Sequence, residues 1–168
     1  MHRLILMRHA SAERAPGPGR DRERPLSAGG RLDAAGMGRA LAARGLRPDR
    51  ALVSSATRTR ETWDQMHEAL GDAEVRHEPA LYNADTDVLR RFVEASEDEV
   101  GCLMVVAHNP GIHLLAVEYL VESAAPPSIL DRLSGGFEPA TAAIFTVDPA
   151  GRCTWEGLLE PGKSGDGK

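Results

Sequence analysis

Short apolar runs alternate along the chain with longer segments in which apolar residues recur at helical spacing. Continuous apolar runs of this kind are typical of strands that are covered on both faces of a sheet. The runs and their flanking turn residues predict strands at 4–7, 51–53, 74–77, 102–107, 141–147 and 153–159. The last two strands flank a turn of sequence DPAG, which predicts a hairpin.

Between the strands, apolar positions three and four residues apart predict amphipathic helices. These helices are expected at 27–44, 57–70, 85–93 and 109–121. Ser27 and Asp85 are suitable N-cap residues, and Pro110 is expected in the first turn of the last helix. The first helix contains glycines at positions 29, 30, 36 and 38, each of which costs up to about 1 kcal/mol relative to alanine. A short apolar segment, 129–133, follows two prolines that break the chain.

The alternation of strands and helices predicts an α/β fold. We expect a three-layer α/β/α sandwich whose sheet is mostly parallel, with an antiparallel strand at one edge. The length of 168 residues suits one domain, expected over residues 1–160. The polar, glycine-rich segment 161–168 is expected to be a flexible C-terminal tail.

Composition excludes several classes of function. The net charge is −5, from 20 basic and 25 acidic side chains, whereas nucleic-acid binding requires a basic surface. No apolar run approaches the roughly 18 residues of a membrane span. The apolar run at 4–7 is shorter than the core of a signal peptide and is interrupted by Arg8 and His9. The two cysteines do not form a disulfide framework. We therefore expect a cytoplasmic protein that binds neither membrane nor nucleic acid.

Basic side chains follow three of the predicted strands. The first strand is followed directly by Arg8 and His9, and the strongest apolar strand is followed by His108. The second strand leads into two serines and then Arg58, in the first turn of a helix. Ligands of open α/β sheets bind beyond the carboxyl ends of the strands. If these strands are parallel neighbours, two arginines and two histidines meet at one rim.

Such a group of potential cations requires an anion among them. A phosphoryl group fits, because its charge is spread over oxygens that positioned cations can stabilise during transfer. One imidazole can also attack phosphorus directly as a covalent nucleophile. An arginine or histidine just after a strand can instead simply cap exposed carbonyls, but three strand ends in register favour a site.

The same segments resemble those of a known family. The sequence LMRHA at 6–10 resembles the Arg-His-Gly signature of the histidine phosphatase superfamily, which has the phosphoglycerate-mutase-like fold. The sequences VSSATRTRET at 53–62 and VAHNP at 106–110 resemble its second and third blocks, and residues 137–147 resemble its C-terminal strand region. The short length and the sequence RPLS at 24–27 are most similar to the bacterial SixA-type phosphohistidine phosphatases.

The resemblance implies roles for individual residues. It makes His9 the nucleophile that becomes phosphorylated. It implies three further side chains around the phosphate: Arg8, Arg58 and His108. Two more are candidates for contacts with the phosphate or the substrate: Arg24 and Asn109. It implies hydrolysis without a metal or a cofactor.

The chain departs from the family pattern at two places. Ala10 stands where the usual residue is glycine. Residues 80–84 occupy the place where many members carry a glutamate, and the flanking Glu78, Asp85 and Asp87 do not match it. An alkoxide leaving group needs a proton donor, whereas an imidazole has a conjugate acid of pKa about 6.5 and departs more easily. The missing acid therefore favours phosphohistidine as the substrate.

The sequence leaves three functions open. The first is a phosphohistidine phosphatase acting on a phosphorylated protein, because the chain has little room for a lid over a small substrate. The second is a phosphomonoesterase acting on a small phosphorylated metabolite, and the third is a phosphate-recognition module without catalysis. His108 and His113 are not surrounded by a zinc motif. We expect a monomer or a weak dimer.

Overall fold

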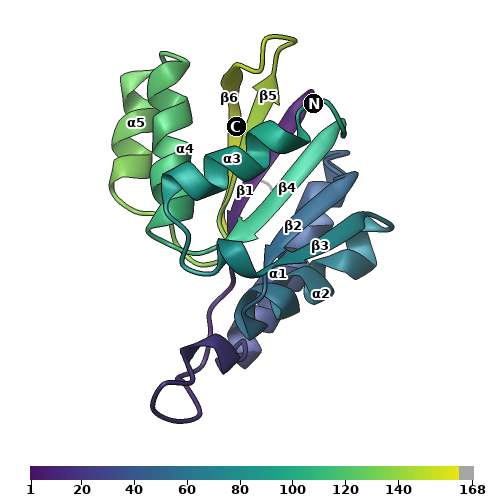
Figure 1. The fold of residues 1–168 in the computed structure, drawn as a ribbon, viewed down its shortest axis with the longest axis vertical. Helices are drawn as coiled ribbons and strands as arrows, with labels where there is room; N and C mark the ends of the chain where they lie inside the picture. Colours follow the sequence, from purple (N-terminus) through teal and green to yellow (C-terminus); the bar gives the residue numbers. More distant parts are fainter. Residues whose placement is uncertain (163–168) are drawn as a thin grey trace.

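The computed structural model describes residues 1–162 and contains one six-stranded sheet (Figure 1). Its strands are β1 (Arg3–Arg8), β2 (Arg50–Ser54), β3 (Glu74–Glu78), β4 (Cys102–Ala107), β5 (Ala142–Val147) and β6 (Cys153–Leu159). Their order across the sheet is β3-β2-β4-β1-β5-β6. The first four strands are parallel, β5 pairs antiparallel with β1, and β6 pairs antiparallel with β5. The expected mostly parallel sheet with antiparallel pairing at one edge is confirmed.

The connections contain five α-helices and two short 3₁₀ helices within the described residues. They are η1 (Asp21–Glu23), α1 (Ala28–Ala43), α2 (Thr57–Leu70), η2 (Pro79–Leu81), α3 (Thr86–Ser96), α4 (Gly111–Glu122) and α5 (Pro127–Ser134). Ser27 and Asp85 cap α1 and α3 as predicted, accepting hydrogen bonds from the backbone N–H of Gly30 and Val88.

Two local details differ from the prediction. Helix α4 begins at Gly111, and Pro110 occupies its N-cap position instead of the first turn. The apolar segment at 129–133 is part of α5, in which Pro127 is the first residue. Helix α4 has already ended at Glu122. Proline lacks a backbone N–H and is compatible with the first helical position, so Pro127 can start α5.

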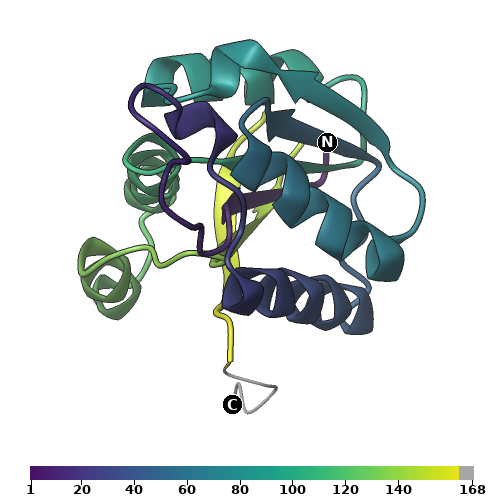
Figure 2. The ribbon, with the colours of Figure 1, turned by 90° about the horizontal axis from the view of Figure 1, so that it is seen from below.

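The helices cover both faces of the sheet. Figures 1 and 2 show α1 and α2 on one face and α3, α4 and α5 on the other. Alternation along β1 divides its side chains between two apolar cores: Leu4 and Leu6 pack toward α3 and α4, and Ile5 and Met7 pack toward α1 and α2. The three-layer sandwich is therefore confirmed.

Two glycines of α1 lie where its backbone approaches other backbone closely. A Cβ atom at Gly38 would lie 2.8 Å from Cα of Met66 in α2. A Cβ atom at Gly30 would lie 2.0 Å from the carbonyl oxygen of Ser11. These glycines lower helix propensity, but they allow α1 to pack against α2 and against the chain that leaves β1.

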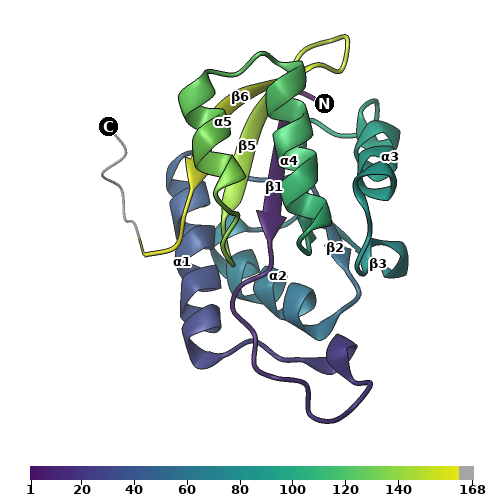
Figure 3. The same cartoon turned by 90° about the vertical axis from the view of Figure 1, so that its left-hand side faces the viewer.

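The segment between β1 and α1 extends beyond the carboxyl end of the sheet (Figures 1 and 3). It is joined to itself by an antiparallel bridge between Ala12 and Leu26, and η1 lies within it. None of the helices in the described part of the chain is long and apolar enough to cross a membrane. Most of the predicted tail 161–168, from residue 163 onward, lies outside the described residues.

Candidate active site

The carboxyl ends of β1, β2 and β4 meet around one cavity of about 320 Å³. The carboxyl ends of these strands face the viewer in Figure 2. All six candidate side chains line it: Arg8, His9, Arg24, Arg58, His108 and Asn109. The structure thus brings together residues that the sequence spreads over a hundred positions.

His9 presents one bare ring nitrogen. Its side chain is only 7% exposed, and Nδ1 lies 2.7 Å from the carbonyl oxygen of Ala10. A carbonyl can only accept, so Nδ1 donates its hydrogen and Nε2 keeps a free lone pair. Burial is the main cause that lowers the pKa of His9 to about 4. The hydrogen bond to Ala10 raises this pKa, and the nearby charges of Arg58 and Arg8 lower it further. The imidazole is therefore neutral at pH 7, as a nucleophile requires.

The backbone beside His9 is fixed by helix α2. Ala10 is fully buried, and its backbone N–H donates to Oγ1 of Thr62 over 3.0 Å. The Thr62 hydroxyl in turn donates to the carbonyl oxygen of Arg58 over 2.7 Å. The two residues that follow β1 are thereby tied to the first turns of the helix that carries Arg58.

His108 faces His9, with ring centroids 5.3 Å apart. Its Nε2 lies 2.7 Å from Oγ of Ser54, which is fully buried at the end of β2. Ser54 Oγ also accepts from the backbone N–H of Ala56 over 3.4 Å. With that acceptor role taken, the serine hydroxyl can donate to Nε2, which leaves the hydrogen of a neutral imidazole on Nδ1. Burial, followed by the charge of Arg58, lowers the pKa of His108 to about 3.

The guanidinium groups are held by backbone carbonyls and by one carboxylate. Arg58 is 4% exposed and donates from Nη1 to the carbonyl oxygen of Asp21 (2.9 Å) and from Nη2 to its Oδ2 (3.2 Å). Arg8 donates from Nη1 to the carbonyl oxygen of Phe137 over 3.1 Å. Burial lowers the pKa of Arg8, and a nearby carboxylate, Glu138, opposes this shift. Both side chains are therefore oriented before any ligand binds.

Three hydrogen-bond donors of the cavity residues are buried without a partner. They are Nε of Arg8, Nε of Arg58 and Nδ1 of His108. A buried donor left unpaired costs about 1–3 kcal/mol, and such groups are rare in native structures. The three residues all line the cavity, so an oxyanion bound there would bring acceptors to these donors. The arrangement therefore suits a phosphoryl group bound in front of Nε2 of His9.

Arg24 lines the cavity, but its hydrogen bonds go to its own loop. Nε donates to the carbonyl oxygen of Glu13 over 2.9 Å, and Nη1 lies 3.4 Å from Oδ1 of Asp21. Asp21 is also bonded to the hydroxyl of Tyr82 over 2.6 Å. That hydrogen bond, followed by the charge of Arg58, lowers the pKa of Asp21, so the carboxylate stays ionised.

Sequence reasoning missed Asp21 and Tyr82. The ring of Tyr82 meets His108 edge-on, with centroids 5.6 Å apart, and the guanidinium of Arg22 covers the Tyr82 ring at 4.7 Å. No motif marks either residue, because the loop of η1 and the η2 segment meet only in the folded chain. The one available signal was negative: residues 80–84 lacked the expected glutamate.

No carboxylate is among the described residues that line the cavity. Oδ1 of Asp85 accepts the capping hydrogen bond of α3. Neither Glu78 nor Asp87 lines the cavity. Asn83, held at a positive φ of 52°, is the residue that lines it from this segment. Within residues 1–162 there is also no cluster of three His, Cys, Asp or Glu side chains able to hold a metal ion.

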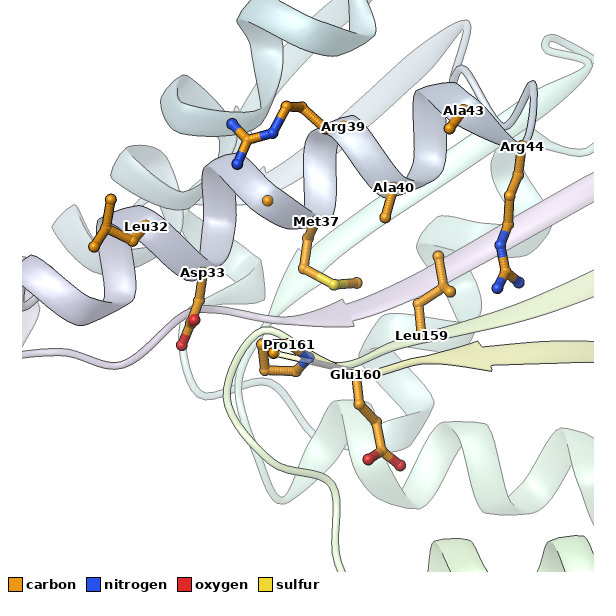
Figure 4. A pocket seen from close by; sticks show the side chains of 12 residues that line it. Leu32, Asp33, Met37, Arg39, Ala40, Ala43, Arg44, Leu159, Glu160 and Pro161 are labelled. Carbon is orange, nitrogen blue, oxygen red and sulfur yellow. The ribbon is translucent and has the colours of Figure 1, made fainter. Parts of the chain in front are cut away.

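A larger hollow, of about 640 Å³, lies between α1 and the end of β6 (Figure 4). The side chains of Met37 and Leu159 point into it, and its lining is mostly apolar. It contains none of the histidines and none of the unpaired donors described above. We therefore place the candidate active site at the smaller, polar cavity.

Comparisons with known proteins agree with this geometry. The model of the histidine phosphatase superfamily (branch 1) matches residues 4–99, which is more than half of the chain. The chain therefore belongs to the histidine phosphatase superfamily.

Individual relatives and solved structures resemble the chain over most of its length. The SixA protein of Agrobacterium tumefaciens, described as a candidate phosphohistidine phosphatase, is 27% identical with a TM-score of 0.84, covering 95% of this chain and 98% of that one. A candidate SixA of Nakamurella multipartitia is 29% identical with a TM-score of 0.80, over 95% and 96%. An uncharacterized protein of Mycobacterium tuberculosis is 31% identical over 84% of this chain and 87% of its own.

Proposed function

We propose that the protein hydrolyses phosphohistidine on another protein through a covalent phosphohistidine intermediate on His9. One observation carries the proposal. The bare Nε2 of His9 faces a cavity in which three buried donors have no partner. A nucleophile and a prearranged oxyanion site are the two parts that transfer of a phosphoryl group requires.

In the first step, Nε2 of His9 attacks phosphorus while the bond from phosphorus to the substrate imidazole breaks. The bonding pair leaves with the substrate nitrogen, and the hydrogen of His9 stays on Nδ1, which donates it to the carbonyl oxygen of Ala10. Arg8, Arg58 and His108 hold the phosphoryl oxygens through the unpaired donors. In the second step, water attacks the phosphorus of phospho-His9 and the pair returns to Nε2, which restores the neutral imidazole and yields dihydrogen phosphate.

The choice of a P–N bond rests on the leaving group. The described lining contains no carboxylic acid that could protonate an alkoxide. A phosphohistidine whose second ring nitrogen is protonated releases a neutral imidazole, so it needs no such acid. The names of the Agrobacterium and Nakamurella relatives agree with this substrate. We propose a cytoplasmic location, with which two buried free cysteines are consistent.

Replacement of the nucleophile tests the proposal. We expect His9→Ala to abolish turnover of a phosphohistidine protein while its thermal unfolding stays cooperative. Wild-type protein incubated with phosphoramidate, a small P–N donor, should acquire an acid-labile phosphoryl group that His9→Ala lacks. Full activity in His9→Ala, or no label on the wild type together with no turnover, would refute the mechanism.

The same assay separates the other two functions. Rates on a phosphohistidine protein are compared with rates on a panel of sugar and nucleotide phosphates. Higher kcat/KM on one of the small esters would make the protein a phosphomonoesterase with the same nucleophile. Tight binding of inorganic phosphate without label or turnover would make it a recognition module.

A further inference from the structure

Asn109 lines the cavity, and its side chain has a buried acceptor without a partner. It lies between β4 and α4, and its Nδ2 donates to the carbonyl oxygen of Phe137 over 3.0 Å. Arg8 donates to the same carbonyl. Because a carbonyl cannot donate, the amino group of the amide must face Phe137. This fixes the orientation of the amide, and its Oδ1 is left buried without a partner.

This oxygen does not suit contact with the phosphoryl group itself. The other three buried atoms of the cavity residues that lack a partner are N–H groups, which match the oxygens of an anion. An amide oxygen placed against a phosphoryl oxygen brings two acceptors together and is repulsive. The partner of Oδ1 must therefore carry a hydrogen.

We propose that Asn109 orients the water that hydrolyses phospho-His9, which rests on the function proposed above. An attacking water turns a lone pair to phosphorus, so its hydrogens point away and need an acceptor. As the oxygen–phosphorus bond forms and the phosphorus–Nε2 bond breaks, the pair returns to His9, and both hydrogens leave on dihydrogen phosphate. Asn109 takes no proton, and its oxygen only fixes the direction of the water, as glutamine does in some GTPases.

The leaving imidazole is a weaker candidate for this partner. The nitrogen through which it is joined to phosphorus carries no hydrogen, and its other nitrogen lies across the ring. A water, in contrast, always has a hydrogen to donate. Gln65 carries the same amide group on α2 and does not line the cavity, so it provides the matched control.

The test separates formation of phospho-His9 from its decay. Each protein is mixed with phosphoramidate, quenched in alkali and assayed for label, and decay is followed after the donor is removed. We expect Asn109→Ala to slow decay about tenfold or more and to change formation by less than about threefold, so that phosphoenzyme accumulates. The phosphoenzyme of Gln65→Ala should decay at the wild-type rate.

A second variant separates the role of Oδ1 as an acceptor from the role of Nδ2 as a donor to the carbonyl of Phe137. Asn109→Asp keeps an oxygen toward the cavity but loses the donor to Phe137, so its phosphoenzyme should decay faster than that of Asn109→Ala. If Asn109→Ala does not fold, near-normal decay in Asn109→Asp supports the proposal. Slower formation with normal decay, or equal losses of both rates in the two variants, would overturn it. Wild-type protein that never becomes labelled would instead refute the function.

Discussion

Ser54 is the hydrogen-bond partner of Nε2 of His108. Its hydroxyl lies 2.7 Å from Nε2 and accepts from the backbone N–H of Ala56, so its own hydrogen is available to Nε2. The hydrogen on Nδ1 then remains available to the phosphoryl group. We infer that Ser54 acts through His108, as a positioning residue. Serine at the end of β2 thus contacts a histidine of the candidate active site.

We expect Ser54→Ala to lower kcat about tenfold and to weaken binding of inorganic phosphate, because the tautomer of His108 is no longer fixed. The variant should also lose about 1–3 kcal/mol of stability, since a buried nitrogen loses its partner. Ser55→Ala is the matched control, because that hydroxyl meets Arg22 outside the cavity lining. Steady-state kinetics and phosphate titration measure the effect. Unchanged phosphate affinity in a folded Ser54→Ala would show that Ser54 does not position His108.

At the scale of elements, the packing of α1 on α2 supports the site. Helix α2 carries Arg58 and Thr62, and both reach the end of β1. The two helices approach each other at Gly38, where a Cβ atom would lie 2.8 Å from Cα and 2.9 Å from the carbonyl oxygen of Met66. Backbone atoms cannot move aside as a flexible side chain can. The position therefore limits how far α2 can shift.

Substitution at this contact should destabilise the protein. We expect Gly38→Ala to lower the free energy of unfolding by about 1–3 kcal/mol, because the added methyl group overpacks the interface. Gly36→Ala, in the same helix, would meet only Arg39 Nη2 at 3.7 Å and should gain up to about 1 kcal/mol through helix propensity. Urea unfolding of both variants checks the pair. Equal effects of the two substitutions would contradict the role of close approach.

The elements themselves could be predicted from local patterns. Apolar runs and cap residues located the strands and most helices, and the strand ends located His9, Arg58 and His108. The role of Asp21 could not be predicted, because it depends on how a polar loop folds back over α2. The hydrogen bonds that Arg8 and Asn109 donate to the carbonyl of Phe137 could not be predicted either, because every residue has a backbone oxygen. The glycines of α1 reduced helix propensity, and only tertiary packing explains them.

At the scale of the whole molecule, the fold buries two imidazoles in their neutral form. The pKa of His9 is lowered to about 4 and that of His108 to about 3, in both cases mainly by burial. An unfolded histidine titrates near pH 6.5. Between these values the unfolded chain binds protons that the folded chain does not. Stability therefore falls as pH falls.

We expect the free energy of unfolding to be insensitive to these histidines above about pH 7 and to decrease from about pH 6.5 to pH 4. The loss from His9 alone is on the order of 3 kcal/mol. Urea unfolding at several pH values measures this loss. The double variant His9→Asn/His108→Gln should show a flatter dependence of the free energy of unfolding on pH. A wild-type protein that gains stability over this range would contradict the assignment of neutral buried rings.

The position of β1 at the centre of the sheet has a consequence for biosynthesis. This strand begins at Arg3, yet its two neighbours begin only at Cys102 and Ala142. A ribosome therefore makes β1 well before either of the two strands that flank it. Until both neighbours are made, the apolar side chains of β1 are without their final cover, and such transiently exposed apolar surface favours aggregation.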